Sequence, residues 1–130
     1  MSAIKILMAD DEPAVLEIMA FKVNAAGYDV ITASDGKTAW ERIQSENPDL
    51  VILDLIMPYM DGFAVLSQLR NHPPSKKWIP VIIISTSDEI QHIQKSFDLQ
   101  ADHYLIKPCR MEDVLKAIKL MVSLIPLRNP

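Results

Sequence analysis

The residues of this chain that are best suited to chemistry lie directly after short apolar runs: Asp10, Asp11, Asp54, Ser85 and Lys107. Asp54 follows four consecutive apolar residues, 50–53, which have no polar alternation and so indicate a strand that is buried on both faces. Ligands of open parallel α/β sheets bind beyond the carboxyl ends of the strands. One polar residue after a strand is ordinary turn chemistry, but several at one edge of a sheet indicate a site.

The three aspartates restrict the chemistry of such a site. Clustered carboxylates raise each other's pKa unless a cation neutralises them, and Mg²⁺ binds one or two carboxylates together with waters and a phosphate oxygen. Three aspartates, one Mg²⁺ and Lys107 sum to zero charge, so the site can accept a dianionic phosphoryl group. Asp54 is the candidate nucleophile, because a carboxylate can form an acyl phosphate. Lys107 and the Ser85 hydroxyl are expected to bind the remaining phosphoryl oxygens.

Five apolar runs predict the strands that must position these side chains: residues 4–9, 28–32, 50–53, 81–84 and 103–106. Five segments of helical spacing alternate with them, which predicts an α/β fold with a parallel sheet and helices on both of its faces. We expect the flavodoxin-like, doubly wound strand order 2-1-3-4-5. The first and third strands are then neighbours, so Asp10, Asp11 and Asp54 share one crevice.

Helix-stop and capping signals predict five helices at residues 13–26, 35–47, 63–72, 88–99 and 111–124. We expect Ser34 or Asp35 to cap the second helix and Ser87 or Asp88 to cap the fourth. One domain covers residues 1–125. Residues 126–130 are interpreted as a short, frayed C-terminal tail or the start of a linker.

Composition restricts the class of protein. At 130 residues the chain is long enough for one domain with a sizeable core. Thirteen Lys and Arg against 17 Asp and Glu give a net charge of −4 without a basic run, so we expect no direct nucleic-acid binding. The single cysteine, Cys109, excludes an internal disulfide and fits a reducing cytoplasm. Since no signal segment or long apolar stretch is present, a cytoplasmic protein without membrane contact is expected.

Four motifs carry a resemblance to a known family: ILMADDEP, VILDLIMPYMDG, PVIIISTS and ADHYLIKP. Together they resemble the receiver domain of two-component response regulators, over residues 4–122. The resemblance implies that Asp54 is the phosphoacceptor. It also implies a Mg²⁺ site made by Asp10, Asp11 and Asp54 with the backbone carbonyl of Ile56.

The resemblance further implies a phosphorelay mechanism. A histidine kinase or histidine phosphotransfer protein donates a phosphoryl group to Asp54, and the domain itself catalyses this transfer and the later hydrolysis. Lys107, in a cis bond to Pro108, binds the phosphate. The switch hydroxyl Ser85 moves toward the phosphoryl oxygens and the switch aromatic Tyr104 turns inward, which remodels the surface of the fourth helix, fifth strand and fifth helix. The output partner stays unknown, and phosphorylation-dependent homodimerisation is left open.

Three further positions bear on the expected site and its switch: Gln100, Ile56 and Glu12. Gln100 stands where the family usually has glycine at the exit of the fourth helix, and it lacks the freedom of glycine in the left-handed conformation. Ile56, two residues after Asp54, flanks the path of the attacking water in this family, so we expect its apolar side chain to give a long-lived phosphoryl group. Glu12 is interpreted as a charge favoured by the helix dipole, with a metal role as the alternative.

Other functions compete with phosphorylation. A receiver-like protein-interaction module that works without phosphorylation would be expected to lack a site residue, and none is missing. An enzyme of the haloacid-dehalogenase type would need a second acid where Ile56 stands. No glycine-rich phosphate loop followed by Lys supports an NTPase. The three histidines have no metal-ligand spacing, so packing or solvent-exposed roles are expected for them.

Overall fold

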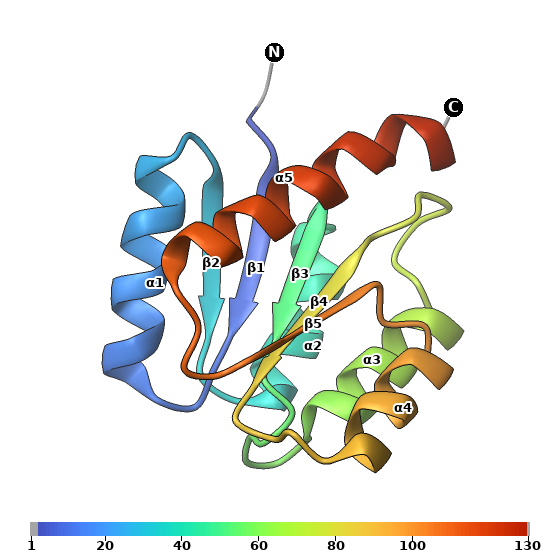
Figure 1. The fold of residues 1–130 in the computed structure, drawn as a ribbon. Coiled ribbons are helices and arrows are strands. Elements are labelled where there is room, and N and C mark those ends of the chain that lie inside the picture. Colours follow the sequence, from blue (N-terminus) through green and yellow to red (C-terminus); the bar gives the residue numbers. More distant parts are fainter. Residues whose placement is uncertain (1–2, 130) are drawn as a thin grey trace.

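A computed structural model describes residues 3–129, in which strands and helices alternate as predicted (Figure 1). The strands are β1 Lys5–Ala9, β2 Asp29–Ala33, β3 Leu50–Leu53, β4 Val81–Ser85 and β5 His103–Ile106. The helices are α1 Pro13–Ala25, α2 Gly36–Glu46, α3 Gly62–Asn71, α4 Ile90–Asp98 and α5 Met111–Arg128. None of these described helices combines the length and the apolar character that a membrane crossing requires.

The strand order β2-β1-β3-β4-β5, with every pair parallel, confirms the predicted doubly wound arrangement. The interior strand β1 pairs on both sides, with Ala9 opposite Ala33 of β2 and opposite Leu53 of β3. The residues that follow Ala9 and Leu53 are therefore neighbours at the carboxyl edge of the sheet. These residues are Asp10 and Asp54, so the strand order alone brings two predicted site residues together.

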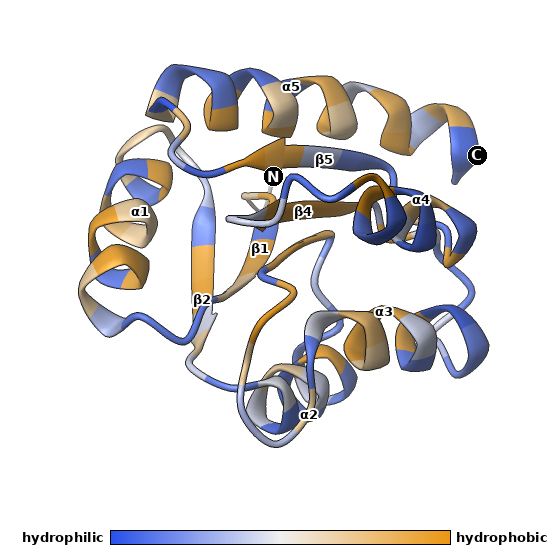
Figure 2. Cartoon of the chain, turned by 60° about the horizontal axis from the view of Figure 1, so that its bottom comes forward, coloured by the Kyte–Doolittle hydropathy of each residue, from blue (hydrophilic) through white to orange (hydrophobic). Residues whose placement is uncertain are grey.

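The pleat of the strands divides the core into two layers. Val51 and Ile83 belong to the layer that packs against α2 and α3, whereas Ile52 and Ile82 belong to the layer that packs against α1 and α5. Figures 1 and 2 show the two groups of helices on opposite faces of the sheet. Because both faces are covered, β3 and β4 have no solvent-facing positions, and this explains their continuous apolar sequences.

The predicted helix caps have different outcomes. Asp35 caps α2, because its carboxylate accepts a hydrogen bond from the Thr38 N–H at 2.7 Å. The prediction for α4 is wrong: the helix begins at Ile90, its cap position is Glu89, and no side chain caps it. The hydroxyl of Ser87 instead contacts the side chain of His92, at 2.6 Å from Nδ1.

The end of α5 also differs from the prediction, because the helix crosses residue 125 and continues through Pro126 to Arg128. The Trp78 N–H donates to Asn129 Oδ1 at 2.6 Å, and Asn129 Nδ2 donates to the Trp78 carbonyl at 3.1 Å. The Arg128 guanidinium lies over the Trp78 ring, 4.1 Å from its centroid. These tertiary contacts outweigh the helix-breaking tendency of Pro126, so the expected frayed tail is wrong up to Asn129. Pro130 lies outside the described residues.

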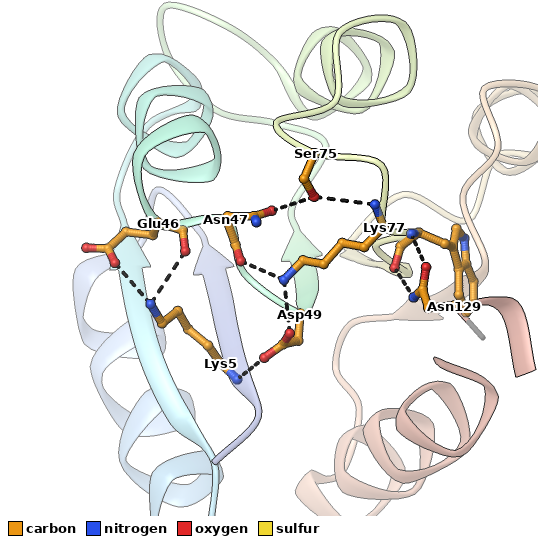
Figure 3. A network of polar contacts seen from close by, with 8 residues as sticks. Lys5, Glu46, Asn47, Asp49, Ser75, Lys77 and Asn129 are labelled. Atoms are coloured by element: carbon orange, nitrogen blue, oxygen red, sulfur yellow. Dashed lines mark hydrogen bonds and ion pairs between the residues drawn. The ribbon is translucent and has the colours of Figure 1, made fainter. Parts of the chain in front are cut away.

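A polar network fixes the edge of the sheet at which the strands begin (Figure 3). Asp49 accepts a hydrogen bond from the Lys5 N–H at 2.9 Å and another from Lys77 Nζ at 3.0 Å. Lys77 Nζ also donates to the Asn47 carbonyl at 2.9 Å. The network joins the start of β1 and the turn before β3 to the connector before β4. The connector is therefore held against the fold although it has no regular structure.

Candidate functional site

Asp10 and Asp54 are held at the carboxyl edge of the sheet by backbone hydrogen bonds. The Asp54 N–H donates to the Ala9 carbonyl at 3.0 Å, and the Asp10 N–H donates to the Ala33 carbonyl at 3.1 Å. Both residues are buried, with 5% of Asp10 and 6% of Asp54 exposed. Two neighbouring buried carboxylates repel one another, so their ionisation requires a cation close by.

Lys107 supplies that cation. Its Nζ lies 2.6 Å from Asp10 Oδ2 and 3.0 Å from Asp54 Oδ2. The lysine follows β5, and its N–H donates to the Ser85 carbonyl at 2.8 Å, which extends the β4–β5 ladder to the site. Its peptide bond to Pro108 is cis, as the resemblance implied. The structure therefore brings Asp10, Asp54 and Lys107 into direct contact.

The charges of this group depend on one another. Burial raises the pKa of Asp54, and the negative charge of Asp10 acts in the same direction. Lys107 and the Ile56 N–H, which donates to Asp54 Oδ1 at 3.2 Å, oppose this rise without cancelling it. Burial alone would lower the pKa of Lys107, but its bonds to Asp10 and Asp54 outweigh burial and the pKa is raised. The lysine therefore stays charged at neutral pH and favours the ionised form of Asp54.

An acidic cluster adjoins these residues. Carboxylate oxygens of Asp10, Asp11 and Glu12 all lie within 4.8 Å of one another, and the Glu12 N–H donates to Asp10 Oδ1 at 2.9 Å. Asp11 and Glu12 are exposed, so solvent and a cation can reach the cluster. Three carboxylates at this spacing have the hard oxygen chemistry that Mg²⁺ prefers. Glu12 thus becomes a candidate ligand beside Asp11, and its signal in the sequence was the run of three acids.

Ser85 and Tyr104 both form hydrogen bonds with Ser87. The sequence did not suggest that Ser87 belongs to the site. Ser85 is fully buried at the end of β4, and its Oγ accepts a hydrogen bond from the Ser87 N–H at 3.2 Å. Tyr104 on β5 is half-buried, and its hydroxyl donates to the Ser87 carbonyl at 2.7 Å. Ser87, which the sequence suggested only as a helix cap, therefore links the two residues assigned to the switch.

Ile56 and Gln100 are the two positions at which the sequence called for comparison with the family. Ile56 is 61% exposed in the loop after Asp54, so its side chain lies at the surface close in sequence to the candidate phosphoacceptor. Gln100 adopts the left-handed conformation, with φ of 71°, in place of the glycine that the family usually has. The Arg70 Nε donates to the Gln100 carbonyl at 3.1 Å, and Arg70 also forms an ion pair with Asp102 at 2.9 Å. These contacts stabilise a backbone conformation that glutamine alone would disfavour.

The chain matches the family model described as "Response regulator receiver domain" over residues 6–119. It is 36% identical over 118 residues to the alkaline phosphatase synthesis transcriptional regulatory protein PhoP of Bacillus subtilis and, over the same length, to the DNA-binding dual master transcriptional regulator RpaA of Synechocystis. Each match covers 91% of this chain and 48% of the relative, so the chain spans about half the length of these relatives.

Solved structures agree with this assignment. The chemotaxis protein CheY4 of Vibrio cholerae superimposes with a TM-score of 0.85 and 28% identity, covering 92% of this chain and 99% of that chain. The receiver domain of the Francisella response regulator 1452 superimposes with a TM-score of 0.83 and 30% identity, covering 92% and 96%. With its parallel sheet, acidic cluster and bridging lysine, the chain belongs to the receiver domain family of two-component response regulators.

Proposed function

We propose that this receiver domain accepts a phosphoryl group on Asp54 from a histidine kinase or a histidine phosphotransfer protein. The observation that carries the proposal is the Lys107 ammonium, which lies 3.0 Å from Asp54 and 2.6 Å from Asp10. A carboxylate becomes more negative when it is phosphorylated, and here the counter-charge is already at hydrogen-bonding distance. Such preorganised charge is the main way in which proteins promote phosphoryl transfer.

In the proposed transfer, a carboxylate oxygen of Asp54 attacks the phosphorus atom of phosphohistidine. A P–O bond forms, the P–N bond breaks, and the imidazole leaves with the electron pair. Lys107 and the Ser85 hydroxyl bind oxygens of the transferred group. The Ile56 N–H orients the Asp54 carboxylate through Oδ1, at 3.2 Å. The domain therefore catalyses its own phosphorylation by positioning and charge neutralisation, and water that reaches the acyl phosphate later hydrolyses it.

Mg²⁺ is the proposed cofactor, because the acidic cluster offers the oxygen donors that it requires. Asp10 and Asp11 would hold the ion, with Glu12 as a further candidate, and Asp54 and the Ile56 carbonyl are the ligands that the family resemblance adds. When bound, Mg²⁺ supplies positive charge to the phosphoryl oxygens. Lys107 alone cannot neutralise two buried aspartates and a phosphoryl group, which supports the need for the ion.

The proposed output surface comprises α4, β5 and α5. It carries exposed apolar side chains on all three elements: Ile90, Phe97, Ile106 and Leu120. Ile106 and Leu120 line the same surface hollow, and apolar side chains that gather in solvent favour a protein partner. A phosphorylation-dependent increase in molar mass would identify a second copy of this chain as that partner. The proposed location is the cytoplasm, in which the lone Cys109 stays reduced.

Intact-protein mass spectrometry tests this proposal. Wild type and Asp54→Asn are incubated with acetyl phosphate, with Mg²⁺ or with a chelator. We expect one phosphoryl adduct on the wild type with Mg²⁺, and none on Asp54→Asn. An adduct that persists on Asp54→Asn would place the acceptor elsewhere. No adduct on the wild type with either acetyl phosphate or a phosphorylated kinase would favour the phosphorylation-independent interaction module.

A further inference from the structure

Ser87, in the loop between β4 and α4, contacts three other residues: Ser85, Tyr104 and His92. Its N–H donates to Ser85 Oγ at 3.2 Å, and its carbonyl accepts the Tyr104 hydroxyl at 2.7 Å. Its own hydroxyl lies 2.6 Å from Nδ1 of His92, in the first turn of α4. The backbone of Ser87 therefore holds both residues assigned to the switch, while its side chain ties them to α4.

The ring of His92 is held in place from other directions. Its Nε2 lies 3.4 Å from Glu89 Oε2, and the ring meets Phe63 of α3 in a T-shaped arrangement with the ring centroids 5.8 Å apart. With the proton on Nε2, the neutral imidazole accepts the Ser87 hydroxyl at Nδ1, and the Nε2 side of the ring faces the Glu89 carboxylate. Lys95 Nζ lies 4.3 Å from the centroid of the Phe63 ring. The His92 ring of α4 therefore contacts both Ser87 in the loop and Phe63 of α3, and so it connects the loop to both helices.

This arrangement determines how Ser85 can act. A serine hydroxyl has one proton and two acceptor lone pairs. The Ser87 N–H occupies an acceptor position of Ser85 Oγ, and in the described part of the chain Ser85 Oγ accepts this bond and donates none. The proton of this fully buried hydroxyl is thereby left for an incoming acceptor. A phosphoryl oxygen on the neighbouring strand end is such an acceptor.

We infer that the hydrogen bond between Ser87 and His92 preorganises the β4–α4 loop for phosphoryl binding. The inference rests on the proposed phosphorylation of Asp54. Ser87 and His92 are positioning residues, because they act through Ser85 and Tyr104. When the bond is absent, the loop is free to move and has to be ordered at the moment the phosphoryl group binds, which lowers affinity.

The test measures Mg²⁺-dependent binding of beryllofluoride, a phosphoryl mimic that bonds to a carboxylate, to the full chain by fluorine NMR. Ser87→Ala removes the hydroxyl. His92→Phe keeps a ring against Phe63 but removes Nδ1, whereas His92→Asn retains a polar group near the position of Nδ1. His72→Phe, at the exposed end of α3, is the matched control.

We expect Ser87→Ala and His92→Phe each to weaken beryllofluoride binding by roughly three- to tenfold, the effect of one neutral hydrogen bond. The double variant should be no weaker than the weaker single variant, because both changes break the same bond. His92→Asn should stay within about twofold of the wild type, and His72→Phe should bind like the wild type.

Amide hydrogen exchange in the free protein provides a second readout. The amide of residue 87 should exchange faster in His92→Phe than in the wild type, while the amide of Ile52 in β3 should not change. A general loss of stability would accelerate both amides. Because the His92 side chain is 40% exposed, its variants are expected to fold, and they carry the test if Ser87→Ala does not.

The outcomes separate the two proposals. Unchanged affinity and unchanged exchange at residue 87 in His92→Phe would overturn the positioning role and leave the phosphorylation of Asp54 intact. Equal weakening in His92→Phe and His92→Asn would overturn it as well, since the polar group would then be irrelevant. Absence of beryllofluoride binding to the wild type would overturn the proposed function and, with it, this inference.

Discussion

Gly62 lies so close to the backbone of Asp54 that a Cβ atom built on the glycine would be 2.2 Å from the Asp54 carbonyl oxygen. The Gly62 N–H also donates to the Leu55 carbonyl at 2.9 Å. The first turn of α3 therefore packs directly on the strand end that carries the proposed phosphoacceptor. Only a residue without a side chain fits at this position unless the backbone moves.

Gly62→Ala is expected to displace this backbone and to affect both stability and chemistry. Overpacking of this kind costs about 1–3 kcal/mol, and misplacement of Asp54 should slow adduct formation at least about tenfold. Gly27→Ala is the control, because its strain comes only from a φ of 106° in open space. It should cost about 1 kcal/mol in urea unfolding and leave the rate of adduct formation unchanged. Equal rates in the two variants would contradict the packing argument.

Lys107→Gln is expected to increase the affinity for Mg²⁺ while it slows phosphorylation. The lysine ammonium contacts both Asp10 and Asp54, so its removal leaves two buried carboxylates in need of a cation. A lost charge at this range corresponds to roughly a tenfold or greater gain in metal affinity. Isothermal titration with MgCl₂ measures this effect. Lys116→Gln, on α5, is the control for a general change in net charge. Weaker Mg²⁺ binding by Lys107→Gln would refute the competition between lysine and metal.

Ile56→Asn is expected to shorten the lifetime of the phosphoryl group. The Ile56 side chain is 61% exposed beside Asp54, and an amide in its place can hold a water near the acyl phosphate. Tyr59→Asn is the matched control, since Tyr59 lies in the same loop, is 88% exposed and has a positive φ that asparagine tolerates. Phosphate release after removal of acetyl phosphate should accelerate in Ile56→Asn alone. Equal release rates in wild type and Ile56→Asn would show that the Ile56 side chain does not lengthen the lifetime of the phosphoryl group.

Asp102 is expected to make stability depend on pH in a defined direction. Burial raises its pKa above 3.8, although the Val81 N–H and Arg70 oppose the rise. The folded state therefore holds the proton more tightly than the unfolded chain does. The stability that Asp102 contributes is full below pH 3.8 and is lost as the pH rises through the folded pKa.

Urea unfolding of wild type and Asp102→Asn between about pH 3 and pH 7 measures this contribution as a difference, because the other titrating groups are shared. The free energy of unfolding of the wild type, relative to that of Asp102→Asn, should fall with rising pH and then level off. A difference that rises with pH would mean that the ion pair with Arg70 at 2.9 Å outweighs burial.

Asn129→Ala is expected to release the end of α5. The asparagine side chain makes two hydrogen bonds to the backbone of Trp78, at 2.6 Å and 3.1 Å. Their loss should cost about 1–2 kcal/mol and accelerate amide exchange in the last turn of α5 selectively. Ser123→Ala on the exposed side of the same helix should leave that exchange unchanged. Protection that survives in Asn129→Ala would show that the Arg128 contact with Trp78 is sufficient.

The amino-acid sequence by itself determined the fold and the place of the site. The continuous apolar runs of β3 and β4 identified them as strands, because both faces of these strands are covered. The alternation of all five strands with helices then predicted the parallel sheet and its order. Asp10, Asp54 and Lys107 were predicted to meet because the carboxyl ends of parallel strands share one edge, and the structure brings them into contact. These are consequences of local patterns combined with general rules of topology.

Only the tertiary structure decided which side chains touch. Lys107 contacts Asp10, 97 residues away, and no local pattern encodes which oxygen it bonds. Pro126 predicts a helix stop, but Trp78 binds the following turn and the helix continues through it. The bond between Ser87 and His92 joins a loop to a helix face, so it depends on where α4 begins. In each case the physical reason is the same: contacts between separate elements depend on their packing, and packing energies outweigh local propensity.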